Sequence, residues 1–157
     1  TEEYAIAAAA SIAKHFLTQS RAVGLIMYAD GEHREIAQSD RGERQLARLN
    51  EMLAVTQAHG AIPIAEVLAA ETMQLSRNTS VIVITPSTST DWVAATRNLI
   101  HRGIKATAVL IDQSSFDGSG SSIDTEIELT ASHIPHYVLR CGDQLADALA
   151  NVRSTNR

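Results

Sequence analysis

Two hydrophobic periods alternate along this chain, one typical of helices and the other of buried strands. Small and apolar residues recur at helical spacing over 2–18, whereas 22–29 is a nearly continuous apolar run. The same contrast repeats further along the chain. Strands are predicted at 22–29, 33–37, 81–85, 105–111 and 136–141, and helices at 2–18, 91–102, 123–132 and 144–152.

Two further helices are predicted between the second and third strands. The spacing of Asp40 and Glu43 resembles a capping box that begins the first of them, and Gly60 ends it. Pro63 suits the first position of the next helix, which continues to Leu75.

Strands that alternate with helices indicate an α/β fold with a mostly parallel, doubly wound sheet between two layers of helices. Asp30 and Gly31 predict a turn after the first strand, which returns the chain as an antiparallel strand at the sheet edge. A length of 157 residues is typical of a single domain, so we expect one domain over 1–157.

Composition argues against nucleic acid and membranes as partners. The net charge of −5 disfavours nucleic acid, and no apolar run reaches the ~20 residues that a membrane-spanning helix needs. Cys141 is the single cysteine, so no internal disulfide can form. We therefore expect a cytoplasmic segment without membrane contact.

The residues that directly follow the strands are the first candidates for a site, because α/β sheets bind ligands at the carboxyl ends of their strands. These candidates are Asp30, Thr85, Ser87, Ser89, Asp91 and Asp112. In the stretch VITPSTSTDW the hydroxyls precede a helix, where capping of free N–H groups is their commonest use. The alternative is that the same groups hold an anion or complete a metal shell. For Asp30, before Gly31, we favour a turn.

Other polar features have structural explanations. Cys141 ends an apolar segment and is expected to be a buried, inert thiol, and Asp143 is expected to cap the last helix. Ser114–Ser122 (SSFDGSGSS) has the composition of a flexible loop. None of the six histidines has the i, i+4 spacing of a helical metal pair, so surface or structural roles are expected. No nucleotide-binding or serine-hydrolase motif occurs.

Three stretches together resemble a known bacterial family. TEEYAIAAAASIAKHFLTQSRAVGLIMYADG, DRGERQLARLNEMLAVTQAHGAIPIAEVL and VIVITPS are similar to the von Willebrand factor A-like region of the family called domain of unknown function 58. The similarity extends over residues 2–112. It implies a three-layer von Willebrand A-type fold, with the strand at 105–111 between those at 81–85 and 136–141. It also implies no enzymatic activity, and a protein partner, a MoxR-type AAA+ ATPase.

Proteins of this type hold a metal with an Asp-x-Ser-x-Ser turn and two further loops, and the match can be followed residue by residue. The Asp-x-Ser-x-Ser strand would precede Glu2. Gly60–Ile64 matches the second loop, with Ile62 in place of the metal-binding Thr, and Thr85-Pro86-Ser87 matches the third without its Asp. The resemblance therefore implies no metal and no cofactor.

The chain opens on a helix, so we expect it to be the C-terminal fragment of a longer protein whose preceding strand is central in the sheet. An unfilled place beside the strands at 23–29 and 81–85 predicts self-association as a homodimer. An alternative function is ligand binding rather than protein interaction. Ser87 to Asp91 after a strand is similar to the phosphate-binding turn of sugar isomerase domains, which would make the chain a phosphosugar-binding domain.

Overall fold

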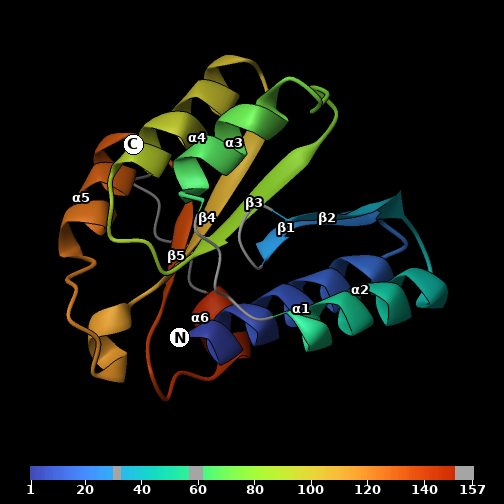
Figure 1. Cartoon of the computed structure of the whole chain (residues 1–157), viewed down its shortest axis with the longest axis horizontal. Helices are drawn as coiled ribbons and strands as arrows, with labels where there is room; N and C mark the ends of the chain where they lie inside the picture. The colour runs from blue at the N-terminus through green and yellow to red at the C-terminus, as the bar shows by residue number, and fades with distance from the viewer. Residues whose placement is uncertain (30–32, 57–61, 151–157) are drawn as a thin grey trace. The chain divides into compact units, whose positions relative to one another are not determined.

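The computed structural model describes residues 1–29, 33–56 and 62–150, and these fold into two compact units (Figure 1). The first unit comprises Glu2–Pro63, and the second begins at Ile64. Each unit has its own sheet and its own helices.

The first unit is an antiparallel hairpin with two helices on one face, as Figure 1 shows. Its elements are α1 (Glu2–Thr18), β1 (Val23–Ala29), β2 (His33–Asp40) and α2 (Glu43–Val55). Opposite residues of the hairpin include Leu25 with Ala37 and Ile26 with Ile36. A small core forms where Ala13 and Leu17 of α1 meet Ala37 and Leu49. The alanines of α1 leave room for close contact with its neighbours.

A buried glutamine ties α2 to the hairpin. Gln45 is 3% exposed, and its Nε2 donates to the carbonyl oxygens of Val23 at 2.7 Å and Gln38 at 2.9 Å. The register of β1 and β2 shifts between Val23 and Leu25, next to this contact. Gln45 therefore satisfies carbonyl groups where the strand pairing is irregular.

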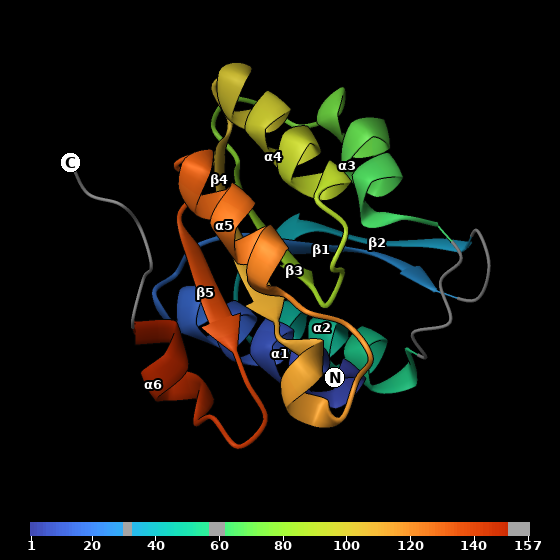
Figure 2. The same cartoon turned by 90° about the vertical axis from the view of Figure 1, so that its left-hand side faces the viewer.

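The second unit contains a three-stranded parallel sheet in the order β3–β4–β5. The elements of this unit are α3 (Ile64–Thr72), β3 (Ser80–Thr85), α4 (Asp91–His101), β4 (Lys105–Ile111), the 3₁₀ helix η1 (Gln113–Phe116), α5 (Ile123–Ala131), β5 (His136–Leu139) and α6 (Leu145–Ala150). Figure 2 shows α4 and α5 in front of these strands. The sequence prediction that 105–111 is the middle strand of these three is confirmed.

The main core of the second unit lies between this sheet and three helices. Val83, Ala108 and Leu110 share one face of the sheet, because Val83 pairs with Ala108 and residues alternate between faces. Against them pack Leu68 of α3, Leu129 of α5 and the Trp92, Val93 and Leu99 side chains of α4. Val109, Ile111 and Leu139 alternate with this set and are also buried, and their continuous apolar run is typical of a strand in a parallel sheet.

The α/β class predicted from the sequence is confirmed, and the predicted antiparallel hairpin is present. The strands, however, are divided between a two-stranded and a three-stranded sheet. The sequence also predicted one doubly wound sheet of the von Willebrand A type and one domain over 1–157. The two sheets and two units do not establish either, so both stay predictions.

Several predicted element ends are wrong. The second strand continues to Asp40, so Asp40 does not begin a helix; its Oδ1 accepts instead from the N–H of Arg41 at 2.8 Å. Gly42, with φ of 85°, is the residue before α2, and it lacks a side chain that could cap. Pro63 directly precedes α3 rather than beginning it. The predicted stop at Gly60 lies outside the described residues.

Within the described residues, no helix combines the length and apolar character needed to cross a membrane.

Candidate functional site

The carboxyl ends of the three parallel strands bring most of the predicted residues to one edge of the sheet. Thr85 ends β3, Asp112 follows β4 and Arg140 follows β5. Ser87 and Ser89 lie in the turn after β3, and Asp91 begins α4 directly after that turn. Asp30 lies outside the described residues, so its predicted role is not addressed by the structure.

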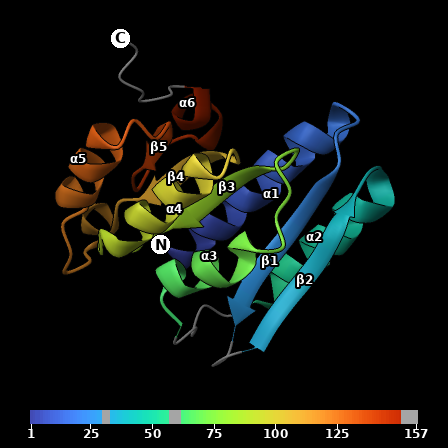
Figure 3. The same ribbon diagram turned by 90° about the horizontal axis from the view of Figure 1, so that it is seen from above.

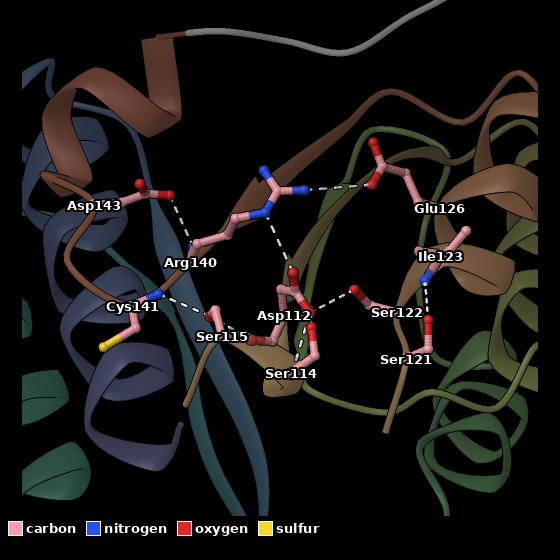
Figure 4. Close-up of polar contacts among 10 residues, drawn as sticks. All are labelled: Asp112, Ser114, Ser115, Ser121, Ser122, Ile123, Glu126, Arg140, Cys141 and Asp143. Carbon is pink, nitrogen blue, oxygen red and sulfur yellow. Dashed lines mark hydrogen bonds and ion pairs between the residues drawn. The ribbon is translucent and has the colours of Figure 1, made fainter. Parts of the chain in front are cut away.

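Asp112 is the centre of a hydrogen-bonded cluster at this edge (Figure 4). Its side-chain Oδ1 accepts from the hydroxyls of Ser114 and Ser122, each at 2.7 Å, and from the N–H of Ser114 at 3.2 Å. Ser114 lies in η1, near the start of the connection after β4, and Ser122 is its last residue before α5. A single carboxylate oxygen therefore holds both ends of this loop.

The other carboxylate oxygen of Asp112 faces a cation. Arg140 Nε donates to Asp112 Oδ2 at 3.2 Å, and Arg140 Nη2 lies 3.9 Å from Glu126 Oε2. The side chain of Asp112 is 10% exposed and that of Arg140 is 42% exposed. Arg140 therefore neutralises a nearly buried carboxylate from the solvent side and extends toward α5.

These contacts decide the ionisation of Asp112. Burial raises the pKa of its carboxyl group, but the hydrogen bonds from Ser114 and Ser122 and the charge of Arg140 together outweigh burial, so the pKa lies below its ordinary value. Asp112 is thus held as a carboxylate that accepts hydrogen bonds. This is the opposite of what a general acid at neutral pH requires.

A second set of contacts joins the loops after β4 and β5. Ser115 Oγ donates to the carbonyl oxygen of Asp112 at 2.7 Å and accepts from the N–H of Cys141 at 2.8 Å. Asp143 Oδ2 accepts from the N–H of Arg140 at 2.8 Å. The prediction that Asp143 caps the last helix is wrong, because its carboxylate closes the turn before that helix. The predicted burial of Cys141 is also wrong, because the residue is exposed.

The serine- and glycine-rich segment after β4, which its composition predicts to be a loop, begins with a short helix. Residues Gln113–Phe116 form a 3₁₀ helix, and Asp117 ends it in the left-handed conformation with φ of 62°. The N–H of Gly118 donates to the carbonyl oxygen of Gln113 at 3.1 Å. A Cβ atom at Gly118 would lie 2.6 Å from that oxygen, so the segment is packed too closely for a side chain there.

The hydroxyl-rich turn after β3 uses its side chains on its own backbone. Thr85 Oγ1 accepts from the N–H of Ser87 at 3.1 Å, Ser87 Oγ from that of Ser89 at 3.4 Å, and Ser89 Oγ from that of Asp91 at 3.3 Å. Thr90, the residue before α4, makes no side-chain cap bond. The hydroxyls therefore form successive turns of the Ser/Thr type rather than one helix cap.

Two buried side chains from other elements hold this turn in place. Trp92 Nε1 donates to the carbonyl oxygen of Ser87 at 3.3 Å, and Thr125 Oγ1 donates to that of Thr88 at 2.9 Å. Both Trp92 and Thr125 are fully buried. The turn is thereby tied to α4 and to α5.

The cluster contains residues that sequence reasoning did not select. Ser114 had a local signal, because Asp112-Gln113-Ser114 has the spacing at which an Asp side chain accepts from the backbone two residues on. Ser122 and Arg140 had none, since they reach Asp112 from 10 and 28 residues away. Only the parallel pairing of β4 with β5 brings Arg140 to this edge.

A shallow, open hollow of about 380 Å³ lies beside the cluster. Its lining includes Val138, Arg140, Gly142, Asp143, Gln144 and Asp147. Within the described residues, no three His, Cys, Asp or Glu side chains come together as a metal site would require.

His136 is a buried polar residue away from this edge. It is 1% exposed, its Nδ1 lies 2.9 Å from the carbonyl oxygen of Ile134, and its Nε2 has no hydrogen-bond partner among the described residues. It begins β5, at the end of the sheet opposite to Asp112. A structural role, as expected from the sequence, accounts for the Nδ1 contact.

Comparison of the chain with family models, with curated proteins and with solved structures found no match. The resemblance to the von Willebrand factor A-like family therefore stays a prediction from the residues.

Proposed function

We propose that this chain is a non-catalytic protein-interaction module of the von Willebrand A type, from a bacterial protein that works with a MoxR-type AAA+ ATPase. The observation that carries the proposal is that polar groups at the carboxyl edge hydrogen-bond to one another and to the backbone. Both carboxylate oxygens of Asp112 accept hydrogen bonds, and the hydroxyls of Thr85, Ser87 and Ser89 accept from the backbone. A catalytic site needs groups that are free to act on a substrate.

The beginning of α5 provides a surface for the partner next to this edge. Ile123 and Ile127 are 64% and 60% exposed, and their i, i+4 spacing places them on one side of the helix. Ile123 directly follows Ser122, which bonds to Asp112. The cluster thereby fixes the start of a helix that presents two large apolar side chains, and burying them against a partner would be favourable.

The phosphosugar-binding alternative gains no support from the turn after β3. A phosphate at that turn would need the N–H groups of Ser87, Ser89 and Asp91, and each already donates to a hydroxyl. The interaction role is therefore the function that we propose, and phosphosugar binding is not.

Binding to the ATPase is tested with the purified chain and the MoxR-type ATPase encoded in the same genome, by biolayer interferometry with ATP present. We expect saturable binding that Ile127→Asp weakens by about tenfold. Met73→Asp is the matched control, because Met73 is 76% exposed and lies on the link after α3 rather than on α5. Absence of binding, or equal affinity of the two variants, would overturn the proposal.

A thermal-shift assay with glucose 6-phosphate tests the alternative directly. The proposal predicts no shift in Tm. A shift that disappears in a Ser87→Ala, Ser89→Ala double variant would replace the interaction role with phosphosugar binding.

A further inference from the structure

The first unit has a second hollow, unrelated to the carboxyl edge. It has a volume of about 430 Å³ and is lined by Glu35 and Ile36 of β2 and by Arg48, Glu51, Met52 and Val55 of α2. Figure 3 looks onto the hairpin, with α2 passing beneath it. We call this hollow the β2–α2 groove.

The lining residues show where the groove runs. Glu35 and Ile36 are consecutive in a strand, so their side chains point to opposite faces of the hairpin. A hollow that touches both must lie along the edge of β2 rather than on one face. Among the strands of the described residues, β2 pairs only with β1, so the groove follows the edge of β2 that has no strand beside it.

The other wall of the groove is one stripe of α2. Arg48, Glu51, Met52 and Val55 have i, i+3, i+4 and i+7 spacing, which places them on one side of the helix. The groove therefore lies between a strand edge that no described strand pairs with and a row of helix side chains. An extended peptide can use both walls at once, because its backbone pairs with the strand while alternate side chains meet the helix.

The chemistry of the groove defines the peptide. Ile36, Met52 and Val55 give it an apolar surface, and Val55 is 70% exposed. Glu35 and Glu51 against the one base Arg48 leave a net negative charge. A complementary segment would alternate apolar side chains with Lys or Arg. Because acids outnumber bases in this lining, a basic segment of a different protein complements it better than a second copy of this chain, which brings the same excess of acid.

We propose that the β2–α2 groove binds an extended, basic and apolar segment of a partner protein, which adds as a strand to the free edge of β2. The proposal rests on the interaction role proposed above and adds a surface and a class of ligand to it. An unpaired edge strand is a ready template for such pairing. The groove is open along its length, which suits a strand better than a small molecule that must be mostly enclosed.

Selection from a phage-displayed library of random peptides tests the proposal on the full chain. The peptides are eight residues long, the length of β2. We expect recovered peptides in which apolar residues alternate with Lys or Arg. Val55→Asp, and separately the double variant Glu35→Lys, Glu51→Lys, should each weaken binding of these peptides by about tenfold. Met73→Asp, a matched exposed apolar residue outside the groove, should leave the affinity unchanged.

Methylated backbones distinguish strand addition from side-chain contact alone. In a strand only every second N–H points to a given neighbour, so N-methylation of one alternate set of peptide amides should abolish binding and methylation of the other set should not. Circular dichroism of each protein variant confirms that it is folded. The proposal is overturned if no peptide is enriched, if Val55→Asp and Met73→Asp bind alike, or if both methylated sets bind like the parent peptide.

The two proposals fail separately in these assays. Val55→Asp should lose the peptides and keep the ATPase, and Ile127→Asp should do the reverse. Loss of both ligands by either variant would contradict the assignment of this groove as a distinct surface.

Discussion

Two serine-rich connections leave neighbouring strands of the same sheet, and they use their hydroxyls in opposite ways. In the turn after β3, the hydroxyls of Thr85, Ser87 and Ser89 accept hydrogen bonds from backbone N–H groups nearby in the chain. In the loop after β4, the hydroxyls of Ser114 and Ser122 donate to the carboxylate of Asp112. The difference lies in the buried charge, which can attract donors from distant positions and hold a whole loop.

The largest effect should come from removing this charge. Asp112→Asn is expected to lower the free energy of unfolding by roughly 2–3 kcal/mol, because hydrogen bonds to charged groups contribute most when the acceptor is buried. Urea unfolding followed by the fluorescence of Trp92, the single and fully buried tryptophan, measures it. Asp91→Asn, which changes an exposed carboxylate at the start of α4 directly after the other connection, is the matched control and should cost about 0.5 kcal/mol. Equal losses would remove the distinction between the two connections.

Low pH should remove the stability difference between the natural chain and Asp112→Asn. The folded state holds the pKa of Asp112 below its ordinary value. Its contribution is therefore complete above the ordinary Asp pKa of ~3.9 and is lost as pH falls through the lower folded value. The stability gap between the natural chain and Asp112→Asn should be constant near neutral pH and shrink below about pH 4. Urea titrations across this range decide it, and a gap that persists to the lowest pH would contradict the ionised role.

Crowding in the loop after β4 can be tested at Gly118. A methyl group there would meet the carbonyl oxygen of Gln113 at 2.6 Å, so Gly118→Ala should destabilise the chain by roughly 1–3 kcal/mol. The exposed neighbour variant Ser119→Ala should have almost no effect in the same urea assay. Similar results for the two would restore the flexible loop that composition alone predicts.

Thr125 links the two serine-rich connections. It lies in α5, which follows the loop after β4, and it bonds to the turn after β3. Thr125→Val keeps the shape and removes the hydroxyl that donates to Thr88, at a cost of about 1 kcal/mol. The Trp92 indole N–H resonance, which reports on Ser87 in the same turn, should also shift. Thr130→Val, at an exposed α5 position whose hydroxyl bonds within its own helix, should leave that resonance unmoved.

The smallest effect is expected in the turn after β3 itself. Ser89→Ala removes an exposed acceptor for the N–H of Asp91, which water can replace, so the loss should be about 0.5 kcal/mol. A loss as large as that of Asp112→Asn would show that this turn is as tightly organised as the neighbouring loop.

Local chemistry in the sequence was sufficient for most elements. The strand at 105–111 was predicted with its observed bounds, because the stretch between Lys105 and Asp112 is apolar except for Thr107, a β-branched residue that suits a strand. Element ends were less predictable. Asp40 has the spacing of a capping box, but pairing with Val23 extends the strand through it, and a long-range pairing outweighs a local capping preference.

The sequence by itself determined the α/β class, the order of the helices and strands, and the collection of polar residues at the carboxyl ends of β3, β4 and β5. These follow from periodicity and from residues close together in the chain. Tertiary structure alone decided that Ser122 and Arg140 meet Asp112, that Glu126 lies near Arg140, and that Cys141 is exposed. The physical reason is that a buried carboxylate is stable only when donors lie close to it in space. Those donors are brought there by packing, and their spacing in the sequence does not reveal that they are close.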